Sequence, residues 1–376
     1  MQSSRIYLSR SAFSHNIALF RKLIGSKTKF TAIIKSNAYG HGLLATASIA
    51  LDAGADYLGV NSLEEAISIR RVFAKATILI MGSIPNLQER KAELADENFW
   101  VMVSRVEEME ILAKLSPTPK IHLKVDTGMS RLGIPFQNAE VLAKEISEKK
   151  LPLSGIATHF ASTEDFTEHS YSMLQLGRFQ DTIDTFAKHG FIDLICHCAS
   201  SASAMLFSEA RMDLVRVGIS LYGLWPSLET KLSLSLMKKD VGMLKPALSW
   251  KTQIQHIQNL NPGTFVGYGS TFKTTHETRL AVVPVGYYEG LDRKLSNHGY
   301  MLIHGERAKI LGRICMNMSM LDITHIPEAK IGDDVVILGK SGNEVISADD
   351  HATWTGTINY EVVTKILGSF PRIIED

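Results

Sequence analysis

A lysine at the end of an apolar run is the first residue of this chain whose position suggests chemistry. Residues 30–34 (FTAII) have the pattern of a buried β-strand, and Lys35 follows them, ahead of Asn37, Tyr39 and two glycines. Such a lysine can be a surface residue whose charged end reaches solvent. It can also be an amine in an apolar site, neutral often enough to form a Schiff base with an aldehyde cofactor. The local pattern leaves both interpretations open.

Several later apolar runs also end in polar residues that a purely structural strand does not need. These residues are Lys124, Asp126, His159, His197 and Arg216. Each of them alone is consistent with a hydrogen-bonded residue of the core or rim. The carboxyl ends of barrel strands converge on one mouth, where barrel enzymes place their chemistry. Together these residues therefore predict one site.

The cysteines predict neither a metal centre nor a disulfide framework. Cys196, His197 and Cys198 are consecutive, and successive side chains of a strand point to opposite faces, so the three cannot easily bind one metal. The odd cysteine, Cys315, leaves no fully paired set, and the spacing lacks the two-residue gap common in zinc and redox motifs. We expect free thiols and no metal.

The elements that must position these residues are short apolar runs that alternate with amphipathic stretches. The apolar runs are residues 30–34, 57–60, 77–81, 99–103, 121–125, 153–158, 193–197 and 213–217. The helical patterns include residues 11–24, 63–73, 106–115, 139–149 and 171–189. Eight strands alternating with helices favour a closed (β/α)8 barrel over an open doubly wound sheet.

After Lys239 the pattern changes to strands without long helices between them. The strand patterns are residues 248–260, 278–285, 300–310, 318–323 and 334–338, and a helical pattern follows at 357–367. The predicted fold class is therefore α/β plus β. We expect a (β/α)8 TIM-type barrel in residues 1–239 and a mostly-β domain in residues 240–376.

The charge balance argues against nucleic acid and membrane partners. The chain has 376 residues, with 40 lysines and arginines against 39 aspartates and glutamates, so no long-range field of one sign is expected. A small zwitterionic substrate suits such a surface. The first residues lack the apolar core of a signal peptide, and no apolar run is long enough to span a bilayer. We predict a cytoplasmic protein.

Residues 32–42 (AIIKSNAYGHG) resemble the pyridoxal-phosphate lysine motif of the alanine racemases, and the resemblance extends over essentially the whole chain. Further similar segments are residues 124–133 (KVDTGMSRLG), 158–161 (THFA), 214–219 (LVRVGI), 265–272 (FVGYGSTF), 285–293 (VGYYEGLDR) and 313–317 (RICMN). The resemblance implies an isomerase that interconverts L-alanine and D-alanine with pyridoxal 5'-phosphate. In bacteria this reaction would supply D-alanine for peptidoglycan.

The resemblance implies that Lys35 and Tyr268 are the two catalytic bases. Without it, Tyr268, a tyrosine between two glycines, could be an exposed hairpin aromatic. Racemisation needs one base on each face of a planar intermediate, so that the proton removed from one antipode can be returned on the opposite side. Lys35 would also carry the cofactor.

The expected cofactor contacts come from the barrel loops and from the resemblance. Barrels often bind phosphate at the loops after strands seven and eight, which here offer Ser201 and the backbone amides of Gly218 and Ile219. The resemblance adds Tyr39 and Tyr360 as phosphate ligands. It also implies that His159 supports Arg216 and that Arg216 contacts the pyridine nitrogen, which weakens the cofactor as an electron sink because arginine keeps its proton.

The expected substrate contacts follow from the same resemblance. Arg131 would hold the substrate carboxylate with a bidentate guanidinium fork. The Met316 amide and Tyr287 would line the substrate's access route. In many members the lysine matching Lys124 is carbamylated and its new negative charge would orient Arg131; the alternative is an ordinary lysine paired with Asp126.

The chain departs from the family pattern at three positions. Ser200 stands where many members have asparagine, Asn317 where many have aspartate, and Ser130 is a further variable point. These departures bear on supporting hydrogen bonds and on substrate preference more than on the reaction.

Other functions and assemblies stay open at this point. A racemase of broader or different specificity, for serine or basic amino acids, fits the same motifs. A barrel-type amino-acid decarboxylase lacks its acidic partner for the pyridine nitrogen here, and a non-catalytic pyridoxal-phosphate carrier would lack a β domain with Tyr268. The resemblance implies a head-to-tail homodimer in which Tyr268 of one subunit completes the barrel mouth of the other, whereas the sequence alone also allows a site within one chain.

Overall fold

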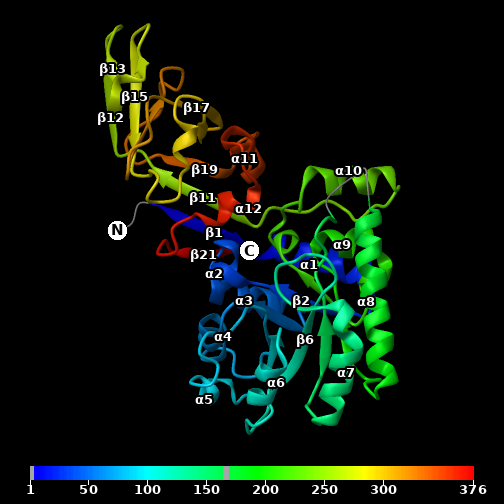
Figure 1. Ribbon diagram of the computed structural model, residues 1–376. Helices are drawn as coiled ribbons and strands as arrows, with labels where there is room; N and C mark the ends of the chain where they lie inside the picture. Colours follow the sequence, from blue (N-terminus) through cyan, green and yellow to red (C-terminus); the bar gives the residue numbers. More distant parts are fainter. Residues whose placement is uncertain (1–3, 164–168) are drawn as a thin grey trace. The chain divides into compact units, whose positions relative to one another are not determined.

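The computed structural model describes residues 4–163 and 169–376, and the chain folds into two compact units (Figure 1). We call residues 12–36 and 46–246 the barrel unit, and residues 1–11, 37–45 and 247–376 the β unit. In the part of the chain that is described, no helix is both long and apolar enough to cross a membrane.

Eight parallel strands form the barrel unit. They are β2 (Lys29–Ile33), β3 (Tyr57–Val60), β4 (Ile78–Ile80), β5 (Phe99–Val103), β6 (Lys120–Asp126), β8 (Gly155–Ala157), β9 (Ile195–His197) and β10 (Leu214–Val217). Their order is β10-β2-β3-β4-β5-β6-β8-β9, and the two-residue strand β7 (Ile134–Pro135) pairs with β6. The two end strands of this sheet, β10 and β9, are joined only by isolated backbone hydrogen bonds within the described chain. Asp213 N donates to Cys196 O (3.2 Å), and Arg216 N donates to Ala199 O (3.0 Å). The barrel is therefore nearly closed, and the predicted fold class is confirmed.

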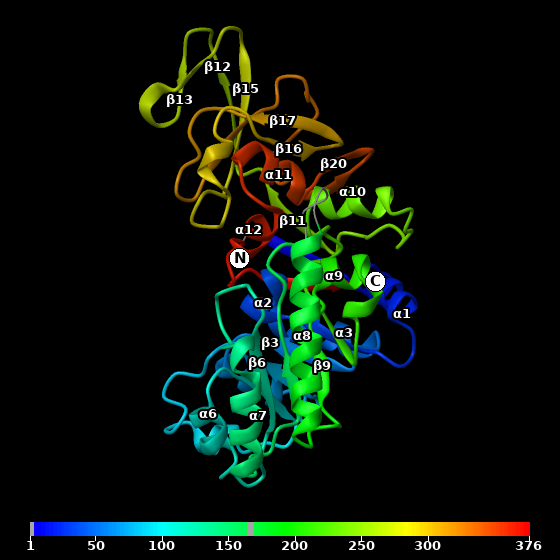
Figure 2. The same cartoon turned by 45° about the vertical axis from the view of Figure 1, so that its right-hand side comes forward.

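Helices lie on the outside of these strands, as Figure 2 shows for α7 and α8. The helices that follow or precede the barrel strands are α1 (Arg10–Ile24), α3 (Leu43–Asp52), α4 (Leu63–Arg70), α5 (Lys91–Leu94), α6 (Val106–Leu112), α7 (Ala139–Glu148), α8 (Ser170–Lys188), α9 (Ser201–Leu206) and α10 (Leu228–Leu236). Side chains from different strands meet inside the barrel, because alternate residues of each strand point inward. Leu79, Trp100, Met102, Ala157 and Leu214 form one such buried cluster.

The β unit is built on a mostly antiparallel sheet. Its strands after the barrel are β11 (Leu248–Gln253), β12 (His256–Leu260), β15 (Thr278–Val283), β16 (Tyr300–Ile303), β17 (Glu306–Ile310), β18 (Ser319–Asp322), β19 (Asp334–Ser341) and β20 (Glu344–Ile346). A small hairpin, β13 (Phe265–Val266) with β14 (Phe272–Lys273), carries the turn that contains Tyr268. Two short helices, α11 (Ala348–Thr355) and α12 (Asn359–Thr364), follow the sheet.

The N-terminal strand belongs to the β unit, which the predicted boundary did not anticipate. β1 (Arg5–Ser9) pairs antiparallel with β11 and parallel with β21 (Arg372–Glu375). The change of unit after the barrel falls between Pro246 and Ala247 and not after Lys239. Residues before Ala247 stay with the barrel because Asn16 bonds both backbone groups of Lys245, at 2.9 Å each. Pairings over such sequence separations leave no local pattern.

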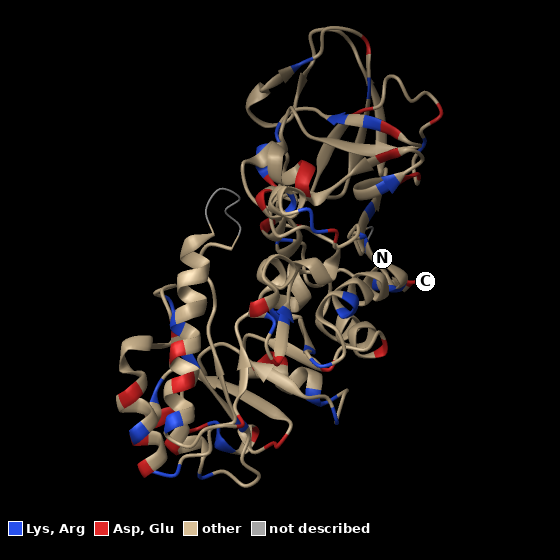
Figure 3. Cartoon of the chain, turned by 90° about the vertical axis from the view of Figure 1, so that its right-hand side faces the viewer, with Lys and Arg blue, Asp and Glu red and all other residues tan. Residues whose placement is uncertain are grey.

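Both charge signs are interspersed along the helices of the barrel unit and the strands of the β unit (Figure 3). This distribution agrees with the balanced composition.

Candidate active site

β2 ends at Ile33, Ile34 separates it from Lys35, and the backbone before Lys35 is held on both sides of the strand. Ile34 N donates to Gly59 O at 2.8 Å, and the Tyr222 hydroxyl donates to Ile33 O at 2.8 Å. Burial lowers the pKa of the Lys35 amine, and the positive charge of Arg131 lowers it further, whereas Glu65 acts in the opposite direction. A lysine with a lowered pKa is neutral, and therefore nucleophilic, more often than one whose charge reaches solvent.

The residues after Lys35 form a left-handed helical turn, α2 (Lys35–Tyr39), where the sequence predicts a loop. Ser36, Asn37, Ala38 and Tyr39 have φ of 55°, 53°, 54° and 52°. Left-handed backbone costs about 1–2 kcal/mol per non-glycine residue. Four such residues in succession persist only where surrounding contacts fix them, which is typical of functional sites.

Contacts within the β unit hold this turn. Leu43 N donates to Asn37 Oδ1 (2.9 Å), and His41 Nδ1 lies 3.1 Å from Tyr39 O. Arg372 donates to Gly40 O at 2.7 Å and, through Nη1, to three carbonyl oxygens of residues 367–370. Gly40 must be glycine, because a Cβ there would overlap Val363 O. Arg372 therefore ties the turn after Lys35 to the chain's C-terminal segment.

The same contacts bring two predicted phosphate ligands together. The rings of Tyr39 and Tyr360 lie 6.1 Å apart, centroid to centroid. Burial raises the pKa of Tyr39 to about 12, so its hydroxyl keeps its proton and can donate to an anion.

Arg216 is buried in the barrel, 6% exposed, and is bonded through its two terminal nitrogens. Nη1 donates to His197 Nδ1 (2.6 Å) and His197 O (3.0 Å), and Nη2 donates to Thr158 O (2.7 Å) and Cys198 O (3.0 Å). His159 Nδ1 lies 3.5 Å from Nη2, at the outer limit of a hydrogen bond. Within residues 4–163 and 169–376, Nε of Arg216 has no acceptor. His197, which the sequence did not assign to Arg216, is thus its closest side-chain partner.

His122, which the sequence motifs did not single out, continues this network. Because Arg216 donates to His197 Nδ1, the proton of His197 sits on Nε2, which donates to His122 Nδ1 at 2.9 Å. The His122 ring stacks on Trp100 with centroids 4.8 Å apart. His122 and Lys124 are two residues apart on β6, so they share a face. That spacing was the one signal in the sequence for His122.

The positive groups of the barrel mouth form one cluster around His159. Burial is the main cause that lowers the pKa of His159 well below its usual value. The positive charges of Arg216, Lys124, Arg131 and Lys35 lower it further. Burial also lowers the pKa of Lys124 strongly, and the positive charges of Arg216 and Arg131 lower that pKa further. Asp126 does not form an ion pair with Lys124 in the described structure; its Oδ1 accepts the amides of residues 128–130 at 2.9–3.1 Å.

The loops after β9 and β10 bring Ser201 and Gly218 together. Gly218 N donates to Ser201 Oγ at 2.9 Å, and Ile219 begins the 3-10 turn that follows (Ile219–Tyr222). Ser200 caps α9, with its backbone N bonded to Ser203 Oγ at 2.7 Å. The departure from asparagine at Ser200 is therefore accommodated by the helix cap.

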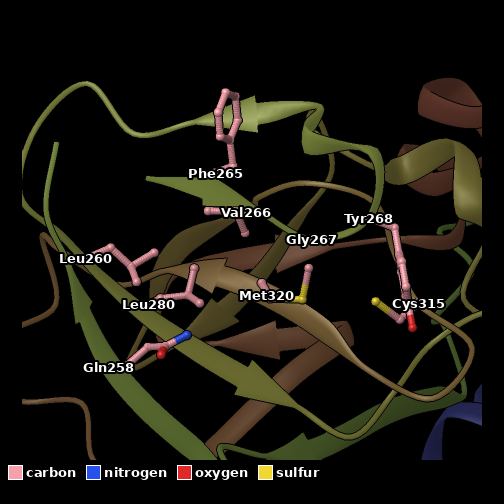
Figure 4. Close-up of a pocket in the computed structure, with 9 residues that line it drawn as sticks. All are labelled: Gln258, Leu260, Phe265, Val266, Gly267, Tyr268, Leu280, Cys315 and Met320. Carbon is pink, nitrogen blue, oxygen red and sulfur yellow. The ribbon is translucent and has the colours of Figure 1, made fainter. Parts of the chain in front are cut away.

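Tyr268 lies in a short turn of the β unit and is 72% exposed. Figure 4 shows its side chain beside Cys315 at a pocket of about 370 Å³. The other lining residues are Gln258, Leu260, Phe265, Val266, Gly267, Leu280 and Met320. Tyr287 and Met316 are also exposed, and Tyr287 N donates to Cys315 O at 3.1 Å. Tyr268, Tyr287 and Met316 thus lie on neighbouring loops of the β unit.

Comparisons with known proteins identify the family. A family model described as "Alanine racemase, N-terminal domain" matches residues 8–226, and "Alanine racemase, C-terminal domain" matches residues 247–374. The chain belongs to the alanine racemase family. A protein of Leptospira interrogans named alanine racemase is 52% identical over 100% of this chain and 96% of its own length. One of Desulfosudis oleivorans is 38% identical over 96% of this chain and 94% of its own length.

Solved structures of alanine racemases have the same fold. The Bacillus anthracis alanine racemase with bound L-Ala-P superposes with a TM-score of 0.90, at 33% identity, over 100% of this chain and 96% of that one. The Streptomyces lavendulae alanine racemase has a TM-score of 0.87 at 29% identity, over 100% and 98%. The resemblance stated from the motifs is confirmed, and as a member of the alanine racemase family the chain is an amino-acid racemase, an isomerase.

The buried histidines of this racemase predict instability in acid. Burial lowers the pKa of His41 and His122 to about 3 and that of His351 to about 4, against about 6.5 in an unfolded chain. Their contribution to stability is full above pH 6.5 and is lost as the pH falls toward 4, because the unfolded chain then binds more protons. Between these pKa values, each of the three histidines should lower the free energy of unfolding by about 1.4 kcal/mol for every pH unit that the pH falls. In urea unfolding at pH 7 and pH 5, His351→Phe should lose less stability than the wild type; equal losses would contradict this.

Proposed function

We propose that this chain racemises L-alanine and D-alanine with pyridoxal 5'-phosphate, using Lys35 and Tyr268 as the two bases. The observation that carries the proposal is the cluster at the barrel mouth, where a lysine of lowered pKa lies among Arg131, His159 and Arg216. An amine that is often neutral can remove a proton from a substrate, and a protonated one can return it.

The donor set of the chain fits pyridoxal phosphate. Ser201, the amides of Gly218 and Ile219, and the hydroxyls of Tyr39 and Tyr360 are donors suited to a phosphate. Arg216 Nε has no acceptor in the described chain, so it is available to donate to a pyridine nitrogen. Lys35 supplies the amine for the aldehyde. The bound cofactor would supply an electron-withdrawing ring that makes the amino acid's α-proton easier to remove.

Arg216 would favour proton exchange over competing reactions. Burial lowers its pKa to about 10, so the guanidinium stays charged and acts as a donor at neutral pH. Its bonds to neutral His197 and to backbone carbonyls leave no acid that could protonate the ring nitrogen. An unprotonated ring withdraws electrons weakly, which favours return of the proton. A barrel-type decarboxylase would need an acidic group where Arg216 lies.

Lys35 and Tyr268 would work on opposite faces of the substrate, whose carboxylate Arg131 would hold. Lys35 Nζ would take the proton from one antipode and Tyr268 Oη would deliver a proton from the other side. For the reverse antipode the roles exchange. A cofactor carrier without turnover would need no second base.

We propose carbamylation of Lys124. Only a neutral amine forms a carbamate, and burial with two neighbouring positive charges favours the neutral form of Lys124. The product would put a negative charge beside Arg131, whose own positive charge lowers the pKa of Lys124. Native mass spectrometry with and without bicarbonate decides between the carbamate and an unmodified lysine.

We further propose that the protein is a cytoplasmic homodimer whose subunits share their sites, and that it supplies D-alanine for peptidoglycan. The exposed Tyr268, Tyr287 and Met316 are large side chains on one group of loops, as expected of residues that contact a partner. Cys196, Cys198 and Cys315 are free, which suits a reducing compartment.

The proposed activity is tested by polarimetry on cofactor-loaded protein with single antipodes of alanine, serine, lysine and arginine. Both antipodes of alanine should lose optical rotation fastest and reach the same end point. A faster reaction with serine or a basic amino acid would transfer the assignment to that substrate. Unchanged rotation with every substrate would refute racemase activity.

A further inference from the structure

Two loops of the β unit, residues 285–292 and 313–318, are joined backbone to backbone. Tyr287 N donates to Cys315 O (3.1 Å), and Tyr288 N donates to Met316 O (3.0 Å). Gly286 lies so close to the second loop that a Cβ there would overlap the carbonyl oxygens of Cys315 and Met316. The two loops are therefore fixed against each other through their backbones, and Tyr287, Tyr288 and Met316 are exposed on them.

A buried carboxylate lies beneath this pair of loops. Glu289 is 8% exposed, and its two oxygens accept from Gly286 N (2.8 Å) and from Asn317 Nδ2 (2.8 Å). In the described part of the chain, Glu289 has no ion pair. A buried charge without a countercharge is costly unless hydrogen bonds satisfy it. Bonds to an ionised acceptor are stronger than neutral ones, so these two bonds define the loop geometry.

The partner at position 317 is a donor. Asn317 is exposed and presents Nδ2 to the carboxylate, and an aspartate in the same rotamer would place a second carboxyl group 2.8 Å from Glu289. Two carboxyl groups at that distance can share one proton at low pH but repel each other when both are ionised. Asn317, which departs from the family pattern, therefore supplies the Glu289 carboxylate with a hydrogen-bond donor where an aspartate would repel it.

We propose that Glu289 and Asn317 are positioning residues that hold the Met316 amide and Tyr287 for the substrate. The inference deepens the proposed function and depends on it for the identity of the substrate. Exposed side chains on these loops have little packing to fix them, so their backbone is fixed from the buried side through Glu289. Neither residue touches the reacting atoms.

The charged groups near these loops include Arg313 on the second loop, which stays protonated, and His351, on which the charge of Asp292 acts and whose pKa burial lowers to about 4. Lys365 pairs with Asp292 (3.0 Å) and Glu361 (2.7 Å), and Arg293 lies near enough to Cys315 to act on its thiol. Burial raises the pKa of Cys315 above its usual value, so the thiol is neutral at pH 6 to 8. These groups keep one charge state in that range, and a new pH dependence in a variant reports on position 317.

The test compares Asn317→Asp, Glu289→Gln and the double variant Glu289→Gln/Asn317→Asp. Asn317→Asp should raise KM for alanine about 10-fold at pH 8, with a smaller change in kcat, and should recover toward pH 6, because one ionised hydrogen bond is replaced by repulsion. Glu289→Gln replaces the ionised acceptor of these bonds by a neutral amide and should change KM a few-fold. In the double variant the amide at position 289 can donate to the carboxylate at position 317 while its oxygen still accepts from Gly286 N, so KM should return to near the wild-type value without the pH effect.

Hydrogen exchange supplies a readout that does not depend on catalysis. The Gly286 amide should exchange faster in Asn317→Asp at pH 8 than in the wild type, and slowly again in the double variant. Asn343→Asp is a matched control, since it makes the same change on an exposed turn of the β unit. A double variant no better than the single ones in exchange and in KM would overturn the inference. If the wild type did not racemise alanine, the exchange results alone would still show whether Glu289 and Asn317 hold the two loops in place.

Discussion

Replacing Lys35 with alanine should lower kcat for alanine racemisation by at least about 10³-fold, because the variant loses a proton-transfer group on one face of the substrate. It also loses the amine that attaches the cofactor. Lys35 follows Ile34, beyond the end of β2, and its neighbours Ile33 and Ile34 are held by backbone hydrogen bonds, so the variant should fold normally. Circular dichroism and the unfolding midpoint check that folding. Full activity in the variant would refute the role of Lys35.

Chemical trapping tests the same assignment without an activity assay. Borohydride treatment of the cofactor-loaded wild type should fix the cofactor to the peptide that contains Lys35, as found by mass spectrometry. Lys124 is the matched alternative, because it also lies in the barrel mouth and also has a lowered pKa. An adduct on Lys124, or on any third lysine, would contradict the assignment.

The barrel could be predicted because its strands are locally encoded. Each of the eight apolar runs contains or overlaps an observed strand, since a strand buried on both faces needs a continuous run of apolar residues. The polar residues at their ends point to the site for the same reason. β1 escaped prediction because its partners, β11 and β21, lie more than two hundred residues away. A single strand with no neighbouring hairpin carries no sign of its partner.

The parts of the site that escaped prediction depend on tertiary contacts. The left-handed turn after Lys35 contradicts the backbone preference of Ser36, Ala38 and Tyr39. It is fixed by Arg372 and by the fit of Gly40 against Val363. The closest partner of Arg216 is His197, and not His159, because the barrel brings β9 and β10 side by side. The hydrogen bond from Asn317 to Glu289 joins two loops and could not be read from either.

Mixing two inactive variants should restore racemase activity if the proposed dimer shares its sites. A Lys35→Ala subunit retains Tyr268, and a Tyr268→Phe subunit retains Lys35. In a heterodimer with shared sites, one site carries both substitutions and the other carries none. Up to about half of the wild-type activity per heterodimer should return, by counting over two symmetry-related sites. Differently tagged subunits, mixed under conditions that allow exchange and purified through both tags, supply the heterodimer for the assay.

The matched control pairs Lys35→Ala with the double variant Lys35→Ala/Tyr268→Phe, a combination in which no site has both bases. This heterodimer should be inactive under either arrangement, so it measures contamination and residual activity. If verified heterodimers of the two single variants are as inactive as this control, each chain uses its own Tyr268 or none. Activity above the control requires that Lys35 and Tyr268 come from different subunits, because neither single variant holds both residues. Tyr268 is 72% exposed and lies on loops with other exposed large side chains, which is why we expect the shared arrangement.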